Sequence, residues 1–169
     1  TLFPYTTLFR SLLQAMIEFD KGDAKRIQHL IKVHEFAALI GTLENISPAA
    51  QNILEAAAIL HDIGIHPAEA KYHSSAGKYQ ESEGPAPAMS LLQAVGGYDD
   101  AFCQRVCWLI AHHHTYGLDA DLDYHILIEA DFLVNAFEDN LSKNAIIAFR
   151  DKNFVTKTGR YLLNTMFAL

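Results

Sequence analysis

The stretch Ala57-Ala58-Ile59-Leu60-His61-Asp62-Ile63-Gly64 decides the fold. An apolar run typical of a buried helix is followed by a histidine and an aspartate, and it stops at a glycine. Burying a neutral polar group without a partner costs roughly 2–7 kcal/mol, and an unpaired carboxylate costs far more. A metal ion would satisfy both side chains, whereas a buried His–Asp hydrogen bond near a helix end is the alternative that this stretch leaves open.

The composition indicates one acidic globular domain. A chain of 169 residues with 50% hydrophobic residues is large enough for its own core. The net charge of -7 argues against a nucleic-acid duplex as partner, because such a protein needs a basic surface. No apolar run reaches membrane-spanning length, so we expect no membrane partner. Two cysteines, Cys103 and Cys107, predict reduced thiols and a cytoplasmic location. Monomer and homodimer both stay open.

Residues 1–11 differ in sequence pattern from the rest of the chain. They lack helical periodicity and a starting methionine, and they resemble a translated sequencing adapter of the kind found in assembled environmental sequence. We therefore expect residues 1–11 to be a non-native leader, as a tag would be. Residues 12–169 would then be a single domain, and the adapter-like segment would indicate a metagenomic source.

Helical periodicity and capping signals predict an all-α fold without strands. Asp23 and Ser47-Pro48 are the clearest starts of helices. Residues 66–88 lack a regular pattern, and we expect a long functional connection there. The expected helices cover about residues 11–19, 24–43, 48–62, 89–95, 100–114, 124–137, 145–149 and 159–167.

Three inward-facing polar clusters fall on three of these helices: His61-Asp62, the run His112 to His114, and Asp131. In helix 24–43, His29 and His34 both lie on apolar lines, and periodicity does not choose between them. Together these side chains form a mixed nitrogen and oxygen donor set. Such a set suits Mn, Fe, Co, Ni, Zn or Mg.

These residues resemble the HD-domain metal-dependent phosphohydrolases, whose signature is a histidine, a distant His-Asp pair and a further aspartate. The first histidine commonly stands in the context Arg-x-x-His-x-x-x-Val, which is found here at 26–33. The resemblance covers about residues 20–140. It implies an HD-domain helical bundle with the metal site between core helices, and the ligands His29, His61, Asp62 and Asp131.

The same resemblance bears on the number of metals. Dinuclear members, including hydrolases of dinucleoside tetraphosphates, carry one histidine in a His-Thr-x-Gly context, which His114 matches, and another in a His-Gly-Pro context, where this chain has Glu83. A second metal would then be held by Glu83 with His113 or His114. Many members have a lysine where this chain has Ile65. In this chain another cation would have to make the contact with phosphate that the lysine makes in those members. Lys78 is the first candidate, followed by Lys71 and Arg26.

The resemblance implies a phosphatase or phosphodiesterase that hydrolyses a phosphate ester or phosphoanhydride, with a nucleotide or small phosphorylated metabolite as substrate. One or two divalent metals would activate the water. Asp62 would hold the metal and orient the water, and His112 or His113 would protonate the leaving oxygen. Two alternatives are a dinuclear iron oxygenase of the same superfamily and a nucleotide-binding HD module without turnover.

Overall fold

The computed structural model describes residues 4–169, which form ten helices and no strand. The predicted all-α class is confirmed. None of the described helices has the length and hydropathy required to cross a bilayer. The helices are α1 (Pro4–Phe19), α2 (Ala24–Leu43), α3 (Pro48–Leu60), α4 (Ile65–Tyr72), α5 (Gly77–Glu83), α6 (Pro85–Val95), α7 (Asp100–Ile110), α8 (Leu122–Glu138), α9 (Lys143–Asn153) and α10 (Lys157–Phe167).

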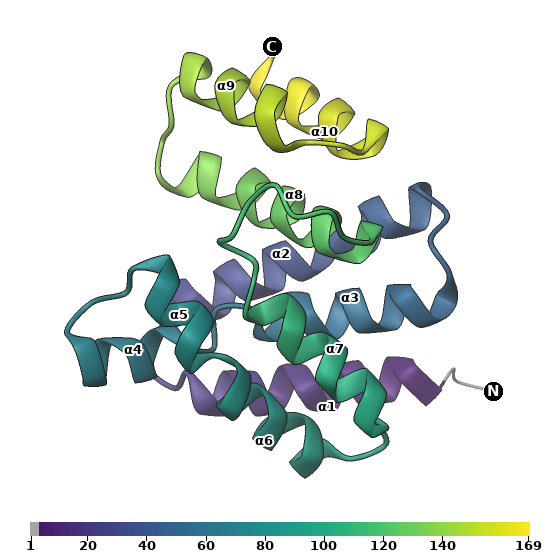
Figure 1. Cartoon of the computed structure of the whole chain (residues 1–169), viewed down its shortest axis with the longest axis vertical. Helices are drawn as coiled ribbons and strands as arrows, with labels where there is room; N and C mark the ends of the chain where they lie inside the picture. The colour runs from purple at the N-terminus through teal and green to yellow at the C-terminus, as the bar shows by residue number, and fades with distance from the viewer. Residues whose placement is uncertain (1–3) are drawn as a thin grey trace.

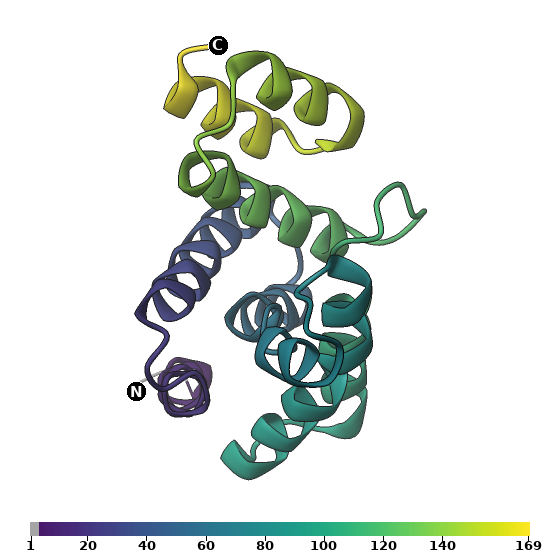
Figure 2. The same ribbon diagram turned by 90° about the vertical axis from the view of Figure 1, so that its left-hand side faces the viewer.

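The helices α2, α3 and α8 form the centre of the molecule. Helix α2 packs against both α3 and α8, and α3 packs against α7 and α8. Helices α1, α6 and α7 lie on one side of this centre, and the hairpin α9–α10 lies beyond α8 on the other side (Figures 1 and 2). Polar side chains that point inward from α2, α3 and α8 therefore meet in the interior.

Local capping explains why the central helices begin where the sequence predicts. The Asp23 carboxylate accepts a hydrogen bond from the backbone N–H of Arg26 at 2.9 Å, which caps α2. The Ser47 hydroxyl accepts from the N–H of Ala50 at 3.2 Å, and Pro48 follows at the first helical position. The predicted bounds of α2 agree with the structure.

The N-terminal helix differs from the expectation. Helix α1 begins at Pro4 instead of near residue 11, and Phe9 packs against the core. Further along α1, Leu12 and Met16 are fully buried. The expected leader includes residues 1–3, which lie outside the described residues. The origin of residues 1–11, and with it the division at residue 12, stays a prediction.

The expected irregular connection over residues 66–88 is wrong. This segment contains α4, α5 and the start of α6, which begins at Pro85 instead of residue 89. Helix α4 ends where His73 adopts a left-handed conformation with φ of 54°. Helices α4 and α5 have 8 and 7 residues. Such lengths give too few turns for an apolar period to stand out from the sequence.

Gly64 allows α5 to approach the His61-Asp62 segment closely. A Cβ atom at this position would lie 2.5 Å from the backbone oxygen of Gln80 and 2.6 Å from the nitrogen of Gly84. Because both are backbone atoms, the clash requires α5 to move. Gly64→Ala should lower the free energy of unfolding by about 1–3 kcal/mol. Urea denaturation measures this, and an unchanged midpoint would contradict the packing.

Candidate metal centre

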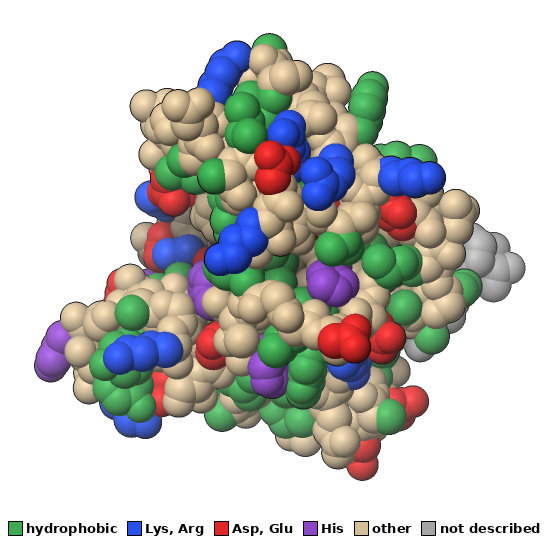
Figure 3. All heavy atoms as spheres, turned by 45° about the horizontal axis from the view of Figure 1, so that its top comes forward, with side chains coloured by type: hydrophobic (Ala, Val, Ile, Leu, Met, Phe, Trp, Pro, Cys, Tyr) green, Lys and Arg blue, Asp and Glu red, His purple; other side chains and the backbone are tan. Residues whose placement is uncertain are grey.

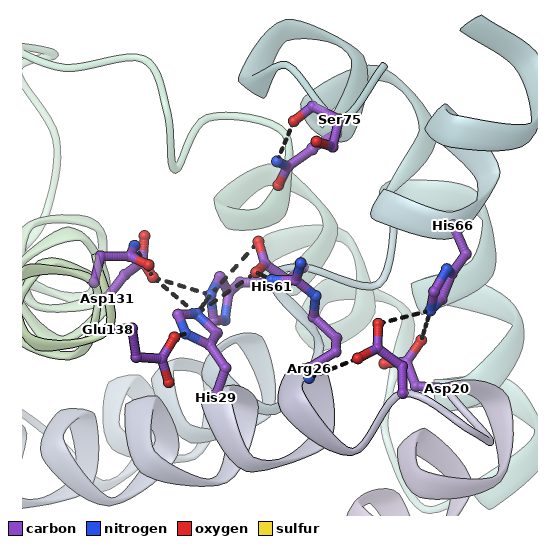
Figure 4. A network of polar contacts seen from close by, with 12 residues as sticks. Asp20, Arg26, His29, His61, His66, Ser75, Asp131 and Glu138 are labelled. Carbon is purple, nitrogen blue, oxygen red and sulfur yellow. Dashed lines mark hydrogen bonds and ion pairs between the residues drawn. The ribbon is translucent and has the colours of Figure 1, made fainter. Parts of the chain in front are cut away.

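The centre of the site consists of three buried side chains from three helices. His29 lies on α2, His61 is the C-cap residue of α3, and Asp131 lies on α8. The Nε2 atom of His29 lies 3.3 Å from the Nε2 atom of His61, and both nitrogens lie within 3.4 Å of Asp131 Oδ1. One ligand atom from each residue lies within 4.8 Å of the others. Figure 4 shows the three side chains pointing toward one another.

The end of α3 explains how His61 and Asp62 share one site. Adjacent side chains on a continuous helix diverge by about 100°. Here the helix ends at Leu60, and residues 61–64 form a turn in which the N–H of Ile63 bonds to the carbonyl oxygen of Leu60 at 3.0 Å. In this turn the carboxylate of Asp62 lies 3.7 Å from Nε2 of His61.

Hydrogen bonds fix the protonation of the ring nitrogens. Nδ1 of His61 donates to the carbonyl oxygen of Ala58 at 2.8 Å, because a carbonyl can only accept. Nδ1 of His29 lies 2.9 Å from the Glu138 carboxylate. Each Nε2 atom then carries a lone pair unless the ring is protonated, so the two face each other as acceptors. A cation between them removes this conflict.

A second group of potential ligands lies beside the first and contains Asp62, His113 and His114. Nδ1 of His113 donates to the carbonyl oxygen of Ile110 at 2.7 Å. Its Nε2 atom is buried and makes no hydrogen bond in the described chain, and it lies 3.5 Å from Asp62 Oδ1. A buried nitrogen acceptor without a donor fits a metal ligand.

The Asp62 carboxylate lies between the two groups. Its Oδ2 atom is 3.5 Å from Nε2 of His29 in the first group, whereas Oδ1 is 3.5 Å from Nε2 of His113 in the second. Oδ1 is also 3.7 Å from Nε2 of His61, and Oδ2 accepts a hydrogen bond from Arg26 at 2.6 Å, so Oδ1 lies near a histidine of each group. A carboxylate in this position could be shared by cations bound at both groups.

His114 is oriented by a residue that the sequence interpretation did not include. Its Nε2 atom lies 3.0 Å from Oε1 of Gln80, whose amide nitrogen donates to the carbonyl oxygen of Ser75 at 2.6 Å. The amide orientation makes Nε2 of His114 the donor and leaves Nδ1 as the free acceptor. Burial, followed by the charge of His113, lowers the pKa of His114 to about 4. The ring is therefore neutral at pH 7, as a metal ligand must be.

The buried carboxylates of the site stabilise positive charge in the interior. Burial alone would lower the pKa of His29, but the hydrogen bond and charge of Asp131 raise it above its ordinary value. Burial would also raise the pKa of Asp131, yet the hydrogen bonds that it accepts when His29 and His61 are protonated hold it well below the usual range. The donor set of four imidazoles and two carboxylates fits divalent transition metals.

The comparisons with known proteins agree with this geometry. A family model described as HD domain matches residues 26–149. The chain belongs to the HD-domain family. The crystal structure of a predicted HD superfamily hydrolase from an uncultured Thermotogales bacterium is similar, with a TM-score of 0.67 and 28% sequence identity. The match covers 94% of this chain and 84% of that one. A search of curated proteins finds no match. HD domains bind divalent metals and include metal-dependent phosphohydrolases, and the groups around Asp62 provide donors for such metals.

The structure does not bring Glu83 to either group of ligands in this HD domain. Its carboxylate accepts hydrogen bonds from Lys71 at 2.8 Å and from the Tyr72 hydroxyl at 2.9 Å, and these contacts hold it away from the histidines. Gln80, one helical turn earlier on α5, is the residue that reaches His114. The position expected to provide a carboxylate ligand therefore has a structural ion pair instead.

Two of the three cations expected to bind phosphate also lie away from the ligands. Lys71 is occupied by Glu83, and Lys78 is exposed with its Nζ 4.7 Å from the centroid of the Tyr79 ring. Arg26 alone reaches the site, where Nη1 donates to Asp62 Oδ2 at 2.6 Å. Lys25, which the sequence interpretation did not include, lines the same cleft as Arg26 and Asp62. This cleft has a volume of about 190 Å³, and His114 also lines it.

The two histidines expected to protonate the leaving group have different positions. His113 directs Nε2 toward Asp62, which is the position of a ligand. His112 stacks on Trp108 with ring centroids 4.3 Å apart, and it belongs to neither ligand group. Its Nδ1 atom donates to the carbonyl oxygen of Trp108 at 2.6 Å.

Two supporting residues on α8 were also missed. Asn135 donates to Asp131 Oδ1 at 2.8 Å, and Glu138 accepts from His29. They lie four and seven residues after Asp131, on the same helix face. This spacing was a usable signal in the sequence, and it identifies both residues as supports of the ligands.

A buried carboxylate lies beside the metal centre without serving it. Asp20 follows α1, and its Oδ2 atom is buried with no hydrogen bond to any described residue. Oδ1 lies 3.7 Å from Nε2 of His66, which is also 3.3 Å from Asp23 (Figure 4). Burial raises the pKa of Asp20 to about 6. The folded protein therefore binds a proton at Asp20 more tightly than the unfolded chain does.

This shift predicts a stability change that depends on pH. Protonated Asp20 stabilises the folded protein at pH values below the pKa that this carboxyl group has in the unfolded chain. This stabilisation is lost as the pH rises through the pKa of Asp20 in the folded protein. Asp20→Asn removes the charge, so at pH 8 the variant should be more stable than the original chain by about 1–2 kcal/mol, with the difference vanishing toward pH 4. Urea denaturation at both pH values checks this, with exposed Asp119→Asn as the control. An equal effect at pH 4 and pH 8 would contradict the assignment.

Proposed function

We propose that this HD domain hydrolyses a phosphate ester or phosphoanhydride of a small phosphorylated metabolite or nucleotide, with two divalent metals. The observation that carries the proposal is the position of Asp62 between two groups of potential ligands, with its Oδ1 atom 3.7 Å from Nε2 of His61 and 3.5 Å from Nε2 of His113. A single structural metal would need only one such group. Two adjacent cations are the usual arrangement for displacement at phosphorus.

The ligands divide into two sets around Asp62. His29, His61 and Asp131 would hold one metal, and His113 and His114 would hold the other, with Asp62 shared. Bound there, the metals would supply a water of lowered pKa and polarise a phosphoryl oxygen. Fe, Mn, Co, Ni and Zn suit these donors, and Mg is a further candidate.

The cleft beside Asp62 supports an anionic substrate. Arg26 and Lys25 line it together with His114. The guanidinium of Arg26 is half-buried, and its planar donors suit the oxygens of a phosphoryl group. We assign to Arg26 the binding of substrate phosphate, in place of the lysines that lie away from the site.

The test is an activity screen of the purified, metal-reconstituted protein against phosphomonoesters, phosphodiesters and nucleotides. We expect phosphate release from at least one class and its loss in His61→Ala. His34→Ala is a matched control, because His34 is also buried on the central helices but pairs with Glu55 at 3.0 Å outside both ligand groups. Hydrolysis that survives in His61→Ala would contradict the proposal.

The same screen separates the two alternatives. Oxygen consumption with an organic substrate, without phosphate release, would support the dinuclear iron oxygenase. Tight nucleotide binding without any product would support the module without turnover.

A further inference from the structure

A second cavity adjoins the metal centre along α8. It has a volume of about 200 Å³ and shares no lining residue with the cleft at Asp62. Its walls come from the loop after the histidine run, from the first half of α8 and from the end of α9. The lining residues include Tyr116, Tyr124, Ile128, Lys152 and Asn153.

The helical repeat of α8 places this cavity next to the metal ligands. Ile128 precedes Asp131 by three residues, which is a rise of about 4.5 Å on nearly the same face. Asn135, which lines the cleft on the other side, follows Asp131 by one further turn. The cavity, the ligand Asp131 and the cleft therefore follow one another along a single face of α8.

Tyr116 connects the cavity to the metal centre in a second way. It lies two residues after His114 and is 46% exposed. Its ring contacts that of Phe149 edge-on, with centroids 5.2 Å apart. The Tyr116 side chain therefore lines the cavity only two residues along the chain from a potential metal ligand.

A lysine that has no polar partner among the described residues lines the cavity. This residue is Lys152, and no hydrogen bond or ion pair within residues 4–169 involves its side chain. The adjacent acid, Asp151, is occupied by Arg150 at 2.9 Å and by Arg160 at 3.8 Å. Asn153 uses its amide nitrogen to bond to the carbonyl oxygen of Phe149 at 3.1 Å, which leaves its amide oxygen available.

The surroundings of Lys152 are basic in an otherwise acidic chain. Residues 143–169 contain five basic residues and one acid, against a net charge of -7 for the whole chain. Figure 3 shows lysine and arginine side chains gathered over the part of the surface where α9 and α10 come forward. This local field favours anions, in contrast to the rest of the protein.

We infer that this cavity binds a second anionic group of the substrate, held by Lys152 while the scissile phosphate occupies the cleft at Asp62. The substrate is then a phosphorylated compound that carries a further carboxylate or phosphate beyond a ring-sized spacer. Tyr116 and Ile128 contact the spacer. The inference rests on the proposed function, because it assigns a binding site to the part of the same substrate that does not react.

The experiment uses ligands that cannot be hydrolysed, so that binding is read without turnover. Phenylphosphonate is compared with 3-phosphonobenzoate and 4-phosphonobenzoate, which add one carboxylate to the same ring. Affinities for the metal-loaded protein are measured by calorimetry. The fluorescence of Trp108 is a second readout, since its ring lies 5.9 Å from that of Tyr124 in the cavity wall.

We expect at least one carboxylated ligand to bind about three- to fivefold more tightly than phenylphosphonate, because Lys152 is exposed and its contact is partly screened. Lys152→Gln should remove this preference without changing the affinity for phenylphosphonate. Lys157→Gln is the matched control, since Lys157 is an exposed lysine of the same hairpin outside the cavity. It should keep the preference.

Three results would overturn the inference: equal affinities for all three ligands, no binding of any of them, or the same loss in Lys157→Gln as in Lys152→Gln. Failure of the proposed function is distinguishable from these results. It would appear as no hydrolysis of any phosphate ester, while the binding preference and its dependence on Lys152 were still measured.

Discussion

Asp62→Asn is expected to lower the rate of phosphate release about a thousandfold. The substitution keeps the size of the side chain and removes the charge that both groups of ligands share. It removes several kcal/mol of stabilisation of the transition state, and each 1.36 kcal/mol corresponds to a factor of ten in rate. Initial rates at saturating metal measure the effect on the best substrate of the activity screen.

The control for this experiment is Asp119→Asn, an exposed carboxylate in the loop before α8. It should leave the rate unchanged. A rate for Asp62→Asn within tenfold of the original protein, at full metal occupancy, would show that Asp62 does not have the central role assigned to it.

Removal of metal is expected to lower the unfolding temperature by about 8–16 °C. Without a cation, the facing Nε2 atoms of His29 and His61, 3.3 Å apart, require protonation to avoid repulsion. A metal at a thousandfold excess over its dissociation constant stabilises the folded state by about 4 kcal/mol, and each kcal/mol corresponds to about 2–4 °C in a protein of this size. Calorimetric scans with and without a chelator measure the shift.

His61→Ala and His34→Ala test the origin of this shift. The chelator should have little effect on His61→Ala, whose first ligand group is incomplete, and its full effect on His34→Ala. The same unfolding temperature with and without metal in the original protein would contradict a metal site in the core.

The central helices were predictable because their signals are local. Asp23 and Ser47-Pro48 bring the cap and the start of a helix together within a few residues, so the beginning of α2 and of α3 follows from the chain itself. The buried His61-Asp62 pair likewise indicated a bound partner, since the cost of leaving it alone is independent of the fold.

The sequence around His29 and His34 does not show which of the two histidines is the metal ligand. Both side chains are buried, with 2% and 8% exposure, so the apolar pattern of α2 cannot separate them. The difference comes from their partners: His29 meets Asp131 of α8, whereas His34 meets Glu55 of α3. Only the resemblance to a known family could place the ligand at His29 before these contacts were seen.

The structure of residues 66–88 could not be predicted from local sequence signals. Their short helices depend on contacts such as the close approach of α5 to Gly64 and on the position of Gln80 beside His114. Neither contact leaves a pattern in the sequence. The motif at Glu83-Gly84-Pro85 pointed to a ligand, but Lys71 and Tyr72 hold that carboxylate elsewhere.

The most direct test of the central claim is a crystal structure of the metal-loaded protein with anomalous scattering, combined with elemental analysis. We expect two metals per chain, one bound by His29, His61 and Asp131 and the other by His113 and His114, with Asp62 shared between them. A single metal on His29, His61, Asp62 and Asp131, with His113 and His114 unbound at saturating metal, would contradict it.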